Sequence, residues 1–157
     1  MRIIVISDTH GRTRNLRKLL QKQQGADLFI HLGDGIDDVE SIRELNHTSN
    51  FVFVKGNVDF SSNEPLEKLL VLEEKRIFLS HGHKLNVKRG YSDFVAEAKN
   101  QNADIALFGH THTAYINYKE NIHFMNPGSL ERPTDGKSRF GIIDIFDGMI
   151  TIYLSSV

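Results

Sequence analysis

The chain has 157 residues, a formal net charge of −1 and no cysteine. This is the length of one ordinary domain, and the near-neutral charge argues against a broad nucleic-acid-binding surface, which requires clustered Lys and Arg. No disulfide or thiolate metal site can form, no apolar run approaches the length of a membrane span, and we expect a single cytoplasmic domain over residues 1–157.

The first half of the chain predicts alternating strands and helices. Residues 3–6, 28–32 and 51–54 are short apolar runs, as in strands that are buried on both faces. Between these runs, apolar residues at helical spacing predict amphipathic helices around residues 16–20 and 39–45. The order strand, helix, strand, helix, strand predicts a parallel sheet with right-handed crossovers.

The second half is expected to be richer in hairpins. Residues 69–80 predict a hairpin around the turn sequence EEK, and a helix around residues 94–98 precedes a strand at residues 105–108. Two further hairpins are predicted at residues 115–125, around KEN, and at residues 140–154, around the turn signal DG. The last third should therefore be mostly antiparallel, and the chain should form mixed sheets.

Polar side chains follow five of the predicted strands at the point where each strand ends. They are Asp8 and His10 in SDTHG, Asp34 in LGDG, Asn57 and Asp59 in KGNVD, His81 and His83 in SHGH, and His110 and His112 in GHTH. Ligands of open α/β sheets bind at the carboxyl ends of the strands, so these residues are expected to converge. Such oxygen and nitrogen donors suit Mn, Fe, Zn or Ni, and they are numerous enough for two ions that share a carboxylate.

The order DxH, GD, GN, H, GHxH resembles the motifs of the calcineurin-like metallophosphoesterases. The short chain and the sequences GHTHTA and NPGS are similar to the small bacterial and archaeal phosphodiesterase branch, the YfcE type. The resemblance implies an α/β fold, a four-layer α/β/β/α sandwich with two mixed β-sheets. It also implies two sets of metal ligands: Asp8, His10 and His112 for a first ion, and Asn57, His81 and His110 for a second, with Asp34 bridging them.

This resemblance implies a metal-dependent phosphodiesterase, a hydrolase in which a bridging hydroxide attacks the phosphorus of a small phosphate ester in line. The catalytic residues are then expected to be Asp34, Asn57, Asp59 and His81. Two divalent ions are the expected cofactors, with manganese preferred and nickel, iron or zinc as alternatives. We expect no stable complex with nucleic acid and no membrane partner, and the sequence leaves open whether the chain forms a homo-oligomer.

One position departs from the family pattern. Many relatives carry a histidine after the asparagine of GN, which is interpreted as the group that protonates the leaving oxygen. This chain has Val58 there, and valine cannot donate a proton. An alternative function is therefore a catalytically weak scaffold that binds other proteins, as a retromer subunit of the same fold does. The complete set of metal-ligand positions favours the enzyme.

The remaining polar residues have simpler interpretations. His31 lies inside a predicted strand and is expected to serve the core, whereas His83 is expected to support a ligand rather than to bind metal. The NPGS sequence at residues 126–129 predicts a tight turn that could line the pocket. Lys88 and Arg89, in VKRGYSD, belong either to a solvated face or to a site that attracts a phosphate.

Overall fold

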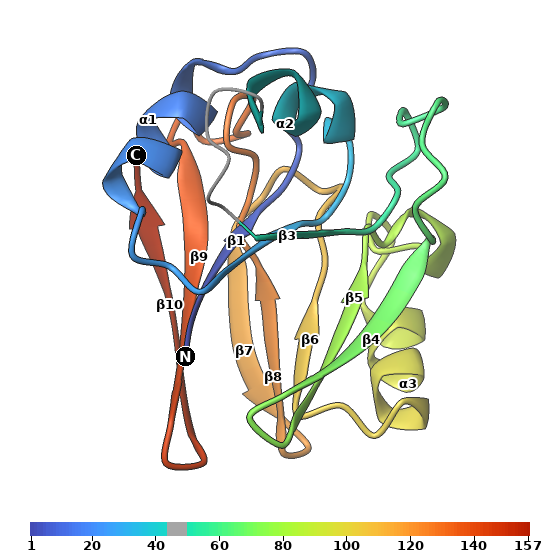
Figure 1. The fold of residues 1–157 in the computed structure, drawn as a ribbon. Helices are drawn as coiled ribbons and strands as arrows, with labels where there is room; N and C mark the ends of the chain where they lie inside the picture. The colour runs from blue at the N-terminus through green and yellow to red at the C-terminus, as the bar shows by residue number, and fades with distance from the viewer. Residues whose placement is uncertain (44–49) are drawn as a thin grey trace.

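The computed structural model describes residues 1–43 and 50–157, and its strands in those ranges form two five-stranded sheets (Figure 1). The first sheet has the order β10-β9-β1-β2-β3 and consists of β1 (Arg2–Ile6), β2 (Leu28–His31), β3 (Phe51–Phe53), β9 (Arg139–Phe146) and β10 (Met149–Ser156). The second sheet has the order β4-β5-β6-β8-β7 and consists of β4 (Glu67–Leu72), β5 (Lys75–Ser80), β6 (Ile105–Leu107), β7 (Tyr115–Lys119) and β8 (Ile122–Asn126).

The first sheet has the predicted parallel arrangement at its centre. β1 pairs with β2, and β2 pairs with β3, in parallel, while the β9–β10 hairpin adds to β1 in antiparallel orientation. Helices α1 (Arg14–Lys22) and α2 (Ile36–Arg43) form the two crossovers. Both predicted helices are thus present, although residues 44 and 45 of the second prediction lie outside the described residues.

The second sheet differs from the sequence-based expectation in one respect. All three predicted hairpins form, but β8 also pairs with β6 in parallel, so that β5, β6 and β8 are a parallel triplet within the sheet. Hairpin signals report only the neighbour across the turn, and for this reason they missed the second partner of β8. A short 3₁₀ helix, η1 (His83–Leu85), and the helix α3 (Ser92–Asn100) connect β5 to β6.

Three apolar clusters hold the layers together. In β1, Ile3 and Val5 contact the cluster between the two sheets, while Ile4 and Ile6 contact the cluster beneath α1 and α2, as the alternation of strand side chains requires. A third cluster, which includes Phe94 of α3, covers the outer face of the second sheet. Helices therefore flank a pair of stacked sheets, which is the four-layer α/β/β/α sandwich (Figure 1).

The loops that follow the parallel strands of both sheets meet at one end of the sandwich. The Asp8 N–H donates to the Gly33 carbonyl at 3.1 Å, which joins the loops after β1 and β2. The His81 ring, after β5, contacts the Leu32 carbonyl at 2.7 Å and thereby links the second sheet to the first. In the ranges that the structure covers, no helix combines the length and the apolar character needed to span a membrane.

Candidate metal centre

Several of the predicted ligands share an unusual backbone conformation at the strand ends. Positive φ angles occur at Asp8 (58°), His10 (49°), Asp34 (60°), His110 (68°) and His112 (57°). Residues other than glycine rarely adopt this left-handed region, and each such residue costs about 1–3 kcal/mol unless its surroundings hold it there. This concentration of strained backbone makes that end of the sandwich a candidate functional site.

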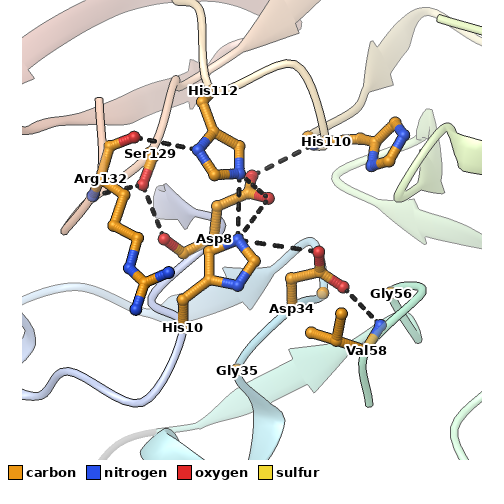
Figure 2. Close-up of polar contacts among 12 residues, drawn as sticks. Asp8, His10, Asp34, Gly35, Gly56, Val58, His110, His112, Ser129 and Arg132 are labelled. Atoms are coloured by element: carbon orange, nitrogen blue, oxygen red, sulfur yellow. Dashed lines mark hydrogen bonds and ion pairs between the residues drawn. The ribbon is translucent and has the colours of Figure 1, made fainter. Parts of the chain in front are cut away.

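The first group of ligand atoms comes from Asp8, His10 and His112, whose side chains point toward one another (Figure 2). Asp8 Oδ1 lies 3.7 Å from His10 Nε2 and 3.2 Å from His112 Nε2, and the two Nε2 atoms are 3.0 Å apart. Asp8 is fully buried, yet its Oδ1 accepts no hydrogen bond from the described residues. A buried carboxylate oxygen without a donor, facing two imidazole nitrogens, fits a divalent cation.

The second group comes from Asp34, His81 and His110. Asp34 Oδ2 lies 3.3 Å from His81 Nε2, which in turn lies 3.2 Å from His110 Nδ1. The same Asp34 oxygen is 3.8 Å from His10 Nε2, so this carboxylate lies between the two groups. The two imidazoles of GHTH are therefore divided, one for each group.

Backbone carbonyls fix the orientation of two of the imidazoles. His81 Nδ1 donates to the Leu32 carbonyl at 2.7 Å, and His112 Nδ1 donates to the Arg132 carbonyl at 2.9 Å. Each contact fixes a ring proton on Nδ1, so that in the neutral imidazole Nε2 carries the lone pair that a metal ion requires. Metal-binding histidines in proteins are commonly held in this way. Neither carbonyl could have been identified from sequence, since every residue carries one.

The charges of the two groups stabilise both carboxylates in the ionised form. Burial alone would raise the pKa of Asp8, but the neighbouring imidazoles of His10 and His112 outweigh it and hold that pKa well below its ordinary value. Burial would also raise the pKa of Asp34, but the neighbouring His81 outweighs it, and that pKa is lowered as well. Burial, reinforced by the charge of His81, lowers the pKa of His110 to about 4. At neutral pH the site thus offers two carboxylates and a neutral imidazole, the forms in which these groups bind metal.

Asp59, which we expected among the catalytic residues, accepts hydrogen bonds from four backbone N–H groups. Its Oδ2 accepts from Asp34 at 2.7 Å and from Gly56 at 2.8 Å, and its Oδ1 accepts from Gly35 at 2.8 Å and from Ile36 at 3.1 Å. The side chain is buried. Asp59 therefore fixes the loops that follow β2 and β3, and through Asp34 it sets the position of the carboxylate between the two groups.

Asn57 and Val58 lie on the loop that Asp59 holds. The Val58 N–H donates to Asp34 Oδ1 at 3.0 Å (Figure 2), and the residue is 43% exposed. A Cβ added to Gly56 would meet the Asp34 carboxylate, so only glycine allows this approach. The Asn57 side chain is exposed and makes no hydrogen bond within the described residues.

Residues of NPGS hydrogen-bond to the backbone of the loops that carry the ligands. Asn126 Nδ2 donates to the Gly109 carbonyl at 2.8 Å. Ser129 Oγ donates to the Asp8 carbonyl at 2.7 Å (Figure 2). Both side chains are fully buried. The sequence predicted a turn here, but the contacts show that the turn braces the loops that carry Asp8 and His110.

Two further histidines lie near the groups without belonging to them. His31 is fully buried at the end of β2, where its Nδ1 accepts the Gly33 N–H at 3.1 Å, and burial lowers its pKa to about 4. The His83 ring centre lies 5.4 Å from that of His81 and 6.1 Å from that of His110. Asp38 was expected only as an anionic residue at the start of the second helix, yet its Oδ2 accepts the Gly11 N–H at 2.9 Å and braces the loop after β1.

The sequence matches the calcineurin-like phosphoesterase superfamily domain over residues 1–148. The chain belongs to this family. Bacillus subtilis (strain 168) has a relative named probable metallophosphoesterase YsnB, which is 32% identical over 136 residues and covers 85% of this chain and 77% of its own length. Phosphodiesterase YfcE of Escherichia coli (strain K12) is 29% identical over 169 residues, with 92% of this chain and 88% of YfcE covered.

Solved structures share the fold over nearly the whole chain. A Streptococcus pneumoniae TIGR4 protein described as a predicted phosphoesterase has a TM-score of 0.82 at 26% identity, covering 99% of this chain and 88% of that one. Vps29 of Entamoeba histolytica in complex with zinc has a TM-score of 0.75 at 19% identity, covering 99% of both chains. At that identity the second likeness shows the fold alone.

Replacing Asp59 with asparagine should destabilise the protein. In Asp59→Asn an amide nitrogen faces backbone donors, so at least two of the four N–H groups lose their acceptor. We expect the free energy of unfolding to fall by about 2–4 kcal/mol, measured by urea denaturation in chelator. The exposed Asp37→Asn is the matched control and should change this free energy by less than about 1 kcal/mol. Equal effects of the two variants would contradict the assignment.

The metal-free protein should be most stable near pH 6.5, the ordinary pKa of histidine. The pKa values of His81 and His112 are raised in the folded protein. The stability that these two histidines contribute to the fold is therefore complete below pH 6.5 and is lost as the pH rises through the raised pKa values. Burial lowers the pKa of His31 and His110 to about 4, so both favour unfolding as the pH falls from 6.5.

The measurement is the melting temperature in chelator from about pH 5 to about pH 8.5, which should pass through a maximum. His112→Gln should flatten the alkaline side of this profile, since glutamine does not titrate. A wild-type melting temperature that keeps rising above pH 7 would show that the pKa values of His81 and His112 are not raised.

Proposed function

We propose that this protein is a metal-dependent phosphodiesterase with a two-metal site. The observation that carries the proposal is the position of Asp34, whose Oδ2 lies between a group formed with His81 and a group that contains His10. The relative YfcE, named as a phosphodiesterase, supports the same reaction class. The substrate is a small phosphate diester.

The ligands divide between the two ions according to the two groups. Asp8, His10 and His112 would hold the first ion, and His81 and His110 would hold the second, with Asp34 shared. Asn57 is the remaining ligand of the second ion, since it lies between Gly56, which approaches Asp34, and Val58, which donates to it. Manganese is the expected metal, and nickel, iron or zinc satisfy the same nitrogen and oxygen donors.

Two divalent ions carry more positive charge than Asp8 and Asp34 neutralise, so the loaded site attracts an anionic phosphate. When bound, the ions lower the pKa of a coordinated water and stabilise the negative charge that develops on the phosphoryl oxygens. The protein contributes position: the Leu32 and Arg132 carbonyls orient His81 and His112, and Asp59 fixes the backbone that carries Asp34.

No side chain at the Val58 position can protonate the leaving oxygen. The half-exposed Val58 side chain lies beside Asp34, where its own N–H is already engaged. This absence favours one alternative, a catalytically weak scaffold of the same fold. The two functions differ in what they require, because a scaffold has no need for metal ligands that are buried, ionised and oriented by hydrogen bonds.

Metal content tests the shared carboxylate. Asp34→Asn removes a negative charge that both ions share, so it should lower the affinity of both positions, whereas Asp8→Asn should mainly affect one. The measurement is the number of equivalents of manganese bound per chain by equilibrium dialysis, with hydrolysis of bis(p-nitrophenyl) phosphate followed on the same preparations. Chelation of the wild type should abolish hydrolysis, and added Mn²⁺ should restore it.

Two outcomes would count against this proposal. Two full equivalents of metal retained by Asp34→Asn would overturn the shared position of Asp34. Undiminished hydrolysis by the wild type after exhaustive chelation would show that the reaction uses other groups. The exposed Asp37→Asn serves as the matched control and should bind metal as the wild type does.

The leaving group should determine how much the missing acid matters. Nitrophenolate leaves without protonation, whereas an alkoxide does not, and a positioned general acid contributes about 10²–10⁴-fold. The wild type should therefore cleave nitrophenyl diesters much faster than diesters of simple alcohols. Val58→His should increase kcat/KM for an alkyl diester by about tenfold or more, with less than about a threefold change for the nitrophenyl diester.

The matched control is Val58→Gln, which adds a polar side chain that does not titrate and should leave the ratio of the two kcat/KM values as in the wild type. Metal content must be equal in all three proteins. An unchanged ratio in Val58→His would show that water or another residue protonates the leaving oxygen.

A further inference from the structure

A basic pocket lies beside the second ligand group. It has a volume of about 240 Å³ and is lined by His83, Asn86, Lys88, Arg89 and His110. Because His110 belongs to the second group, the pocket borders the candidate metal centre rather than a remote surface. A molecule whose phosphate occupies the centre could therefore extend directly into this pocket.

The loop that carries the two cationic side chains, Lys88 and Arg89, has its backbone fixed by local contacts. Gly82 has a φ of 94°, and a Cβ at this position would approach Val87 Cγ2 to 2.8 Å. The buried Val87 donates its N–H to the Gly82 carbonyl at 3.3 Å, and the Arg89 N–H donates to the Asn86 carbonyl at 2.7 Å. Asn86 Nδ2 also donates to Asp93 Oδ2 at 2.9 Å, which ties the loop to the start of α3. Lys88 and Arg89 thus project from a backbone that is held on both sides.

Neither cation is neutralised by the protein. Arg2, Lys99 and Arg139 pair with neighbouring carboxylates, but across residues 1–43 and 50–157 no carboxylate lies within ion-pair distance of Lys88 or Arg89. Both side chains are exposed at the mouth of the pocket. Two unpaired cations that line one small pocket produce a local positive potential, although the chain as a whole has a net charge of −1.

We propose that this pocket binds a second phosphate group of the substrate, so that the preferred diester carries a phosphate monoester on one of its alcohols. The proposal rests on the phosphodiesterase function, since it places the scissile phosphate at the neighbouring ligand groups. A monoester phosphate carries a charge of about −1.5 to −2 at pH 7 and three strong acceptor oxygens. The Arg89 fork and the Lys88 ammonium supply matching donors and charge.

The exposure of Lys88 and Arg89 determines how strongly they should favour a phosphorylated substrate. Hydrogen bonds to charged groups contribute more than neutral ones, but exposure to water and salt weakens them. We therefore expect each cation to contribute about tenfold to the preference for a phosphorylated substrate, at the low end of charge-assisted contacts. Added salt should reduce this preference.

The test compares two substrates that differ only in the second phosphate. They are thymidine 3′-(p-nitrophenyl phosphate) and the same compound with a 5′-phosphate, both of which release nitrophenolate. The manganese-loaded wild type should show a kcat/KM about a hundredfold higher for the 5′-phosphorylated substrate, the product of two tenfold contributions. Lys88→Ala and Arg89→Ala should each reduce this ratio about tenfold.

Lys84→Ala is the matched control for these variants. Lys84 lies in η1 on the same loop and is exposed, but it does not line the pocket. The control loses one positive charge from the same region, so a general effect of charge would appear in it as well. The substrate ratio of Lys84→Ala should remain within about twofold of the wild type, since distant exposed charges are screened.

A second measurement needs neither metal nor turnover. Inorganic phosphate added to the chelator-treated protein should shift the amide NMR signals of residues 86–90, and Lys88→Ala and Arg89→Ala should weaken this response while Lys84→Ala should not. If these amide signals of the wild type do not shift, the proposal that the pocket binds phosphate is wrong.

The failures of the two proposals are distinguishable. Equal kcat/KM values for the two substrates, in an enzyme that hydrolyses both, would overturn the second-phosphate pocket and leave the phosphodiesterase intact. An equal loss for both substrates in Lys88→Ala and Arg89→Ala would also overturn it, because the cations would then act on the scissile phosphate. Hydrolysis of neither substrate by the metal-loaded protein would overturn the phosphodiesterase and the pocket with it.

Discussion

The buried carboxylate of Asp8 is the constraint on which the architecture of the candidate centre depends. A carboxylate removed from water costs several kcal/mol unless other groups compensate. Here Asp8 Oδ2 accepts the His110 N–H at 3.1 Å, while Oδ1 faces His10 and His112. Asp8 follows β1 of the first sheet, whereas His110 and His112 follow β6 of the second, so satisfying this one carboxylate requires that the two sheets stack in a single register. The apolar cluster between the sheets, which includes Ile3 and Leu107, supplies the force that holds them so.

Strain in the ligand loops is balanced by hydrogen bonds from residues that bind no ligand. Asp59 accepts from four backbone groups, and Ser129 and Asn126 each brace a loop of the site. These contacts are short and buried, where hydrogen bonds are strongest because water does not compete. The left-handed conformations at Asp8 and Asp34 are therefore maintained by the surrounding protein. The protein's own hydrogen bonds thus position the ligand loops, which reduces the entropy that metal binding must overcome.

The ligand groups and their surroundings contribute differently to function. The six clustered side chains define a reaction class, since their chemistry suits divalent ions and phosphate esters generally. The choice among esters depends on what borders the groups. On one side Val58 offers an apolar, half-exposed surface without a proton donor, and on another Lys88 and Arg89 offer unpaired positive charge. Under the proposed function, specificity thus depends on the loops that border the ligand groups.

The sequence by itself determined the secondary structure, the ordered motifs and the chemical type of the site. Short apolar runs and turn signals are local, so the strands and hairpins could be predicted from neighbouring residues. The family match confirms the resemblance that those motifs carried. Only the tertiary structure decided which strands pair and which hydrogen bonds position the site residues. It showed the parallel pairing of β8 with β6, the capture of four N–H groups by Asp59, and the backbone carbonyls that orient His81 and His112. The physical reason is that these contacts join residues far apart in the chain, often through backbone atoms that every residue carries, and such atoms leave no mark on the sequence.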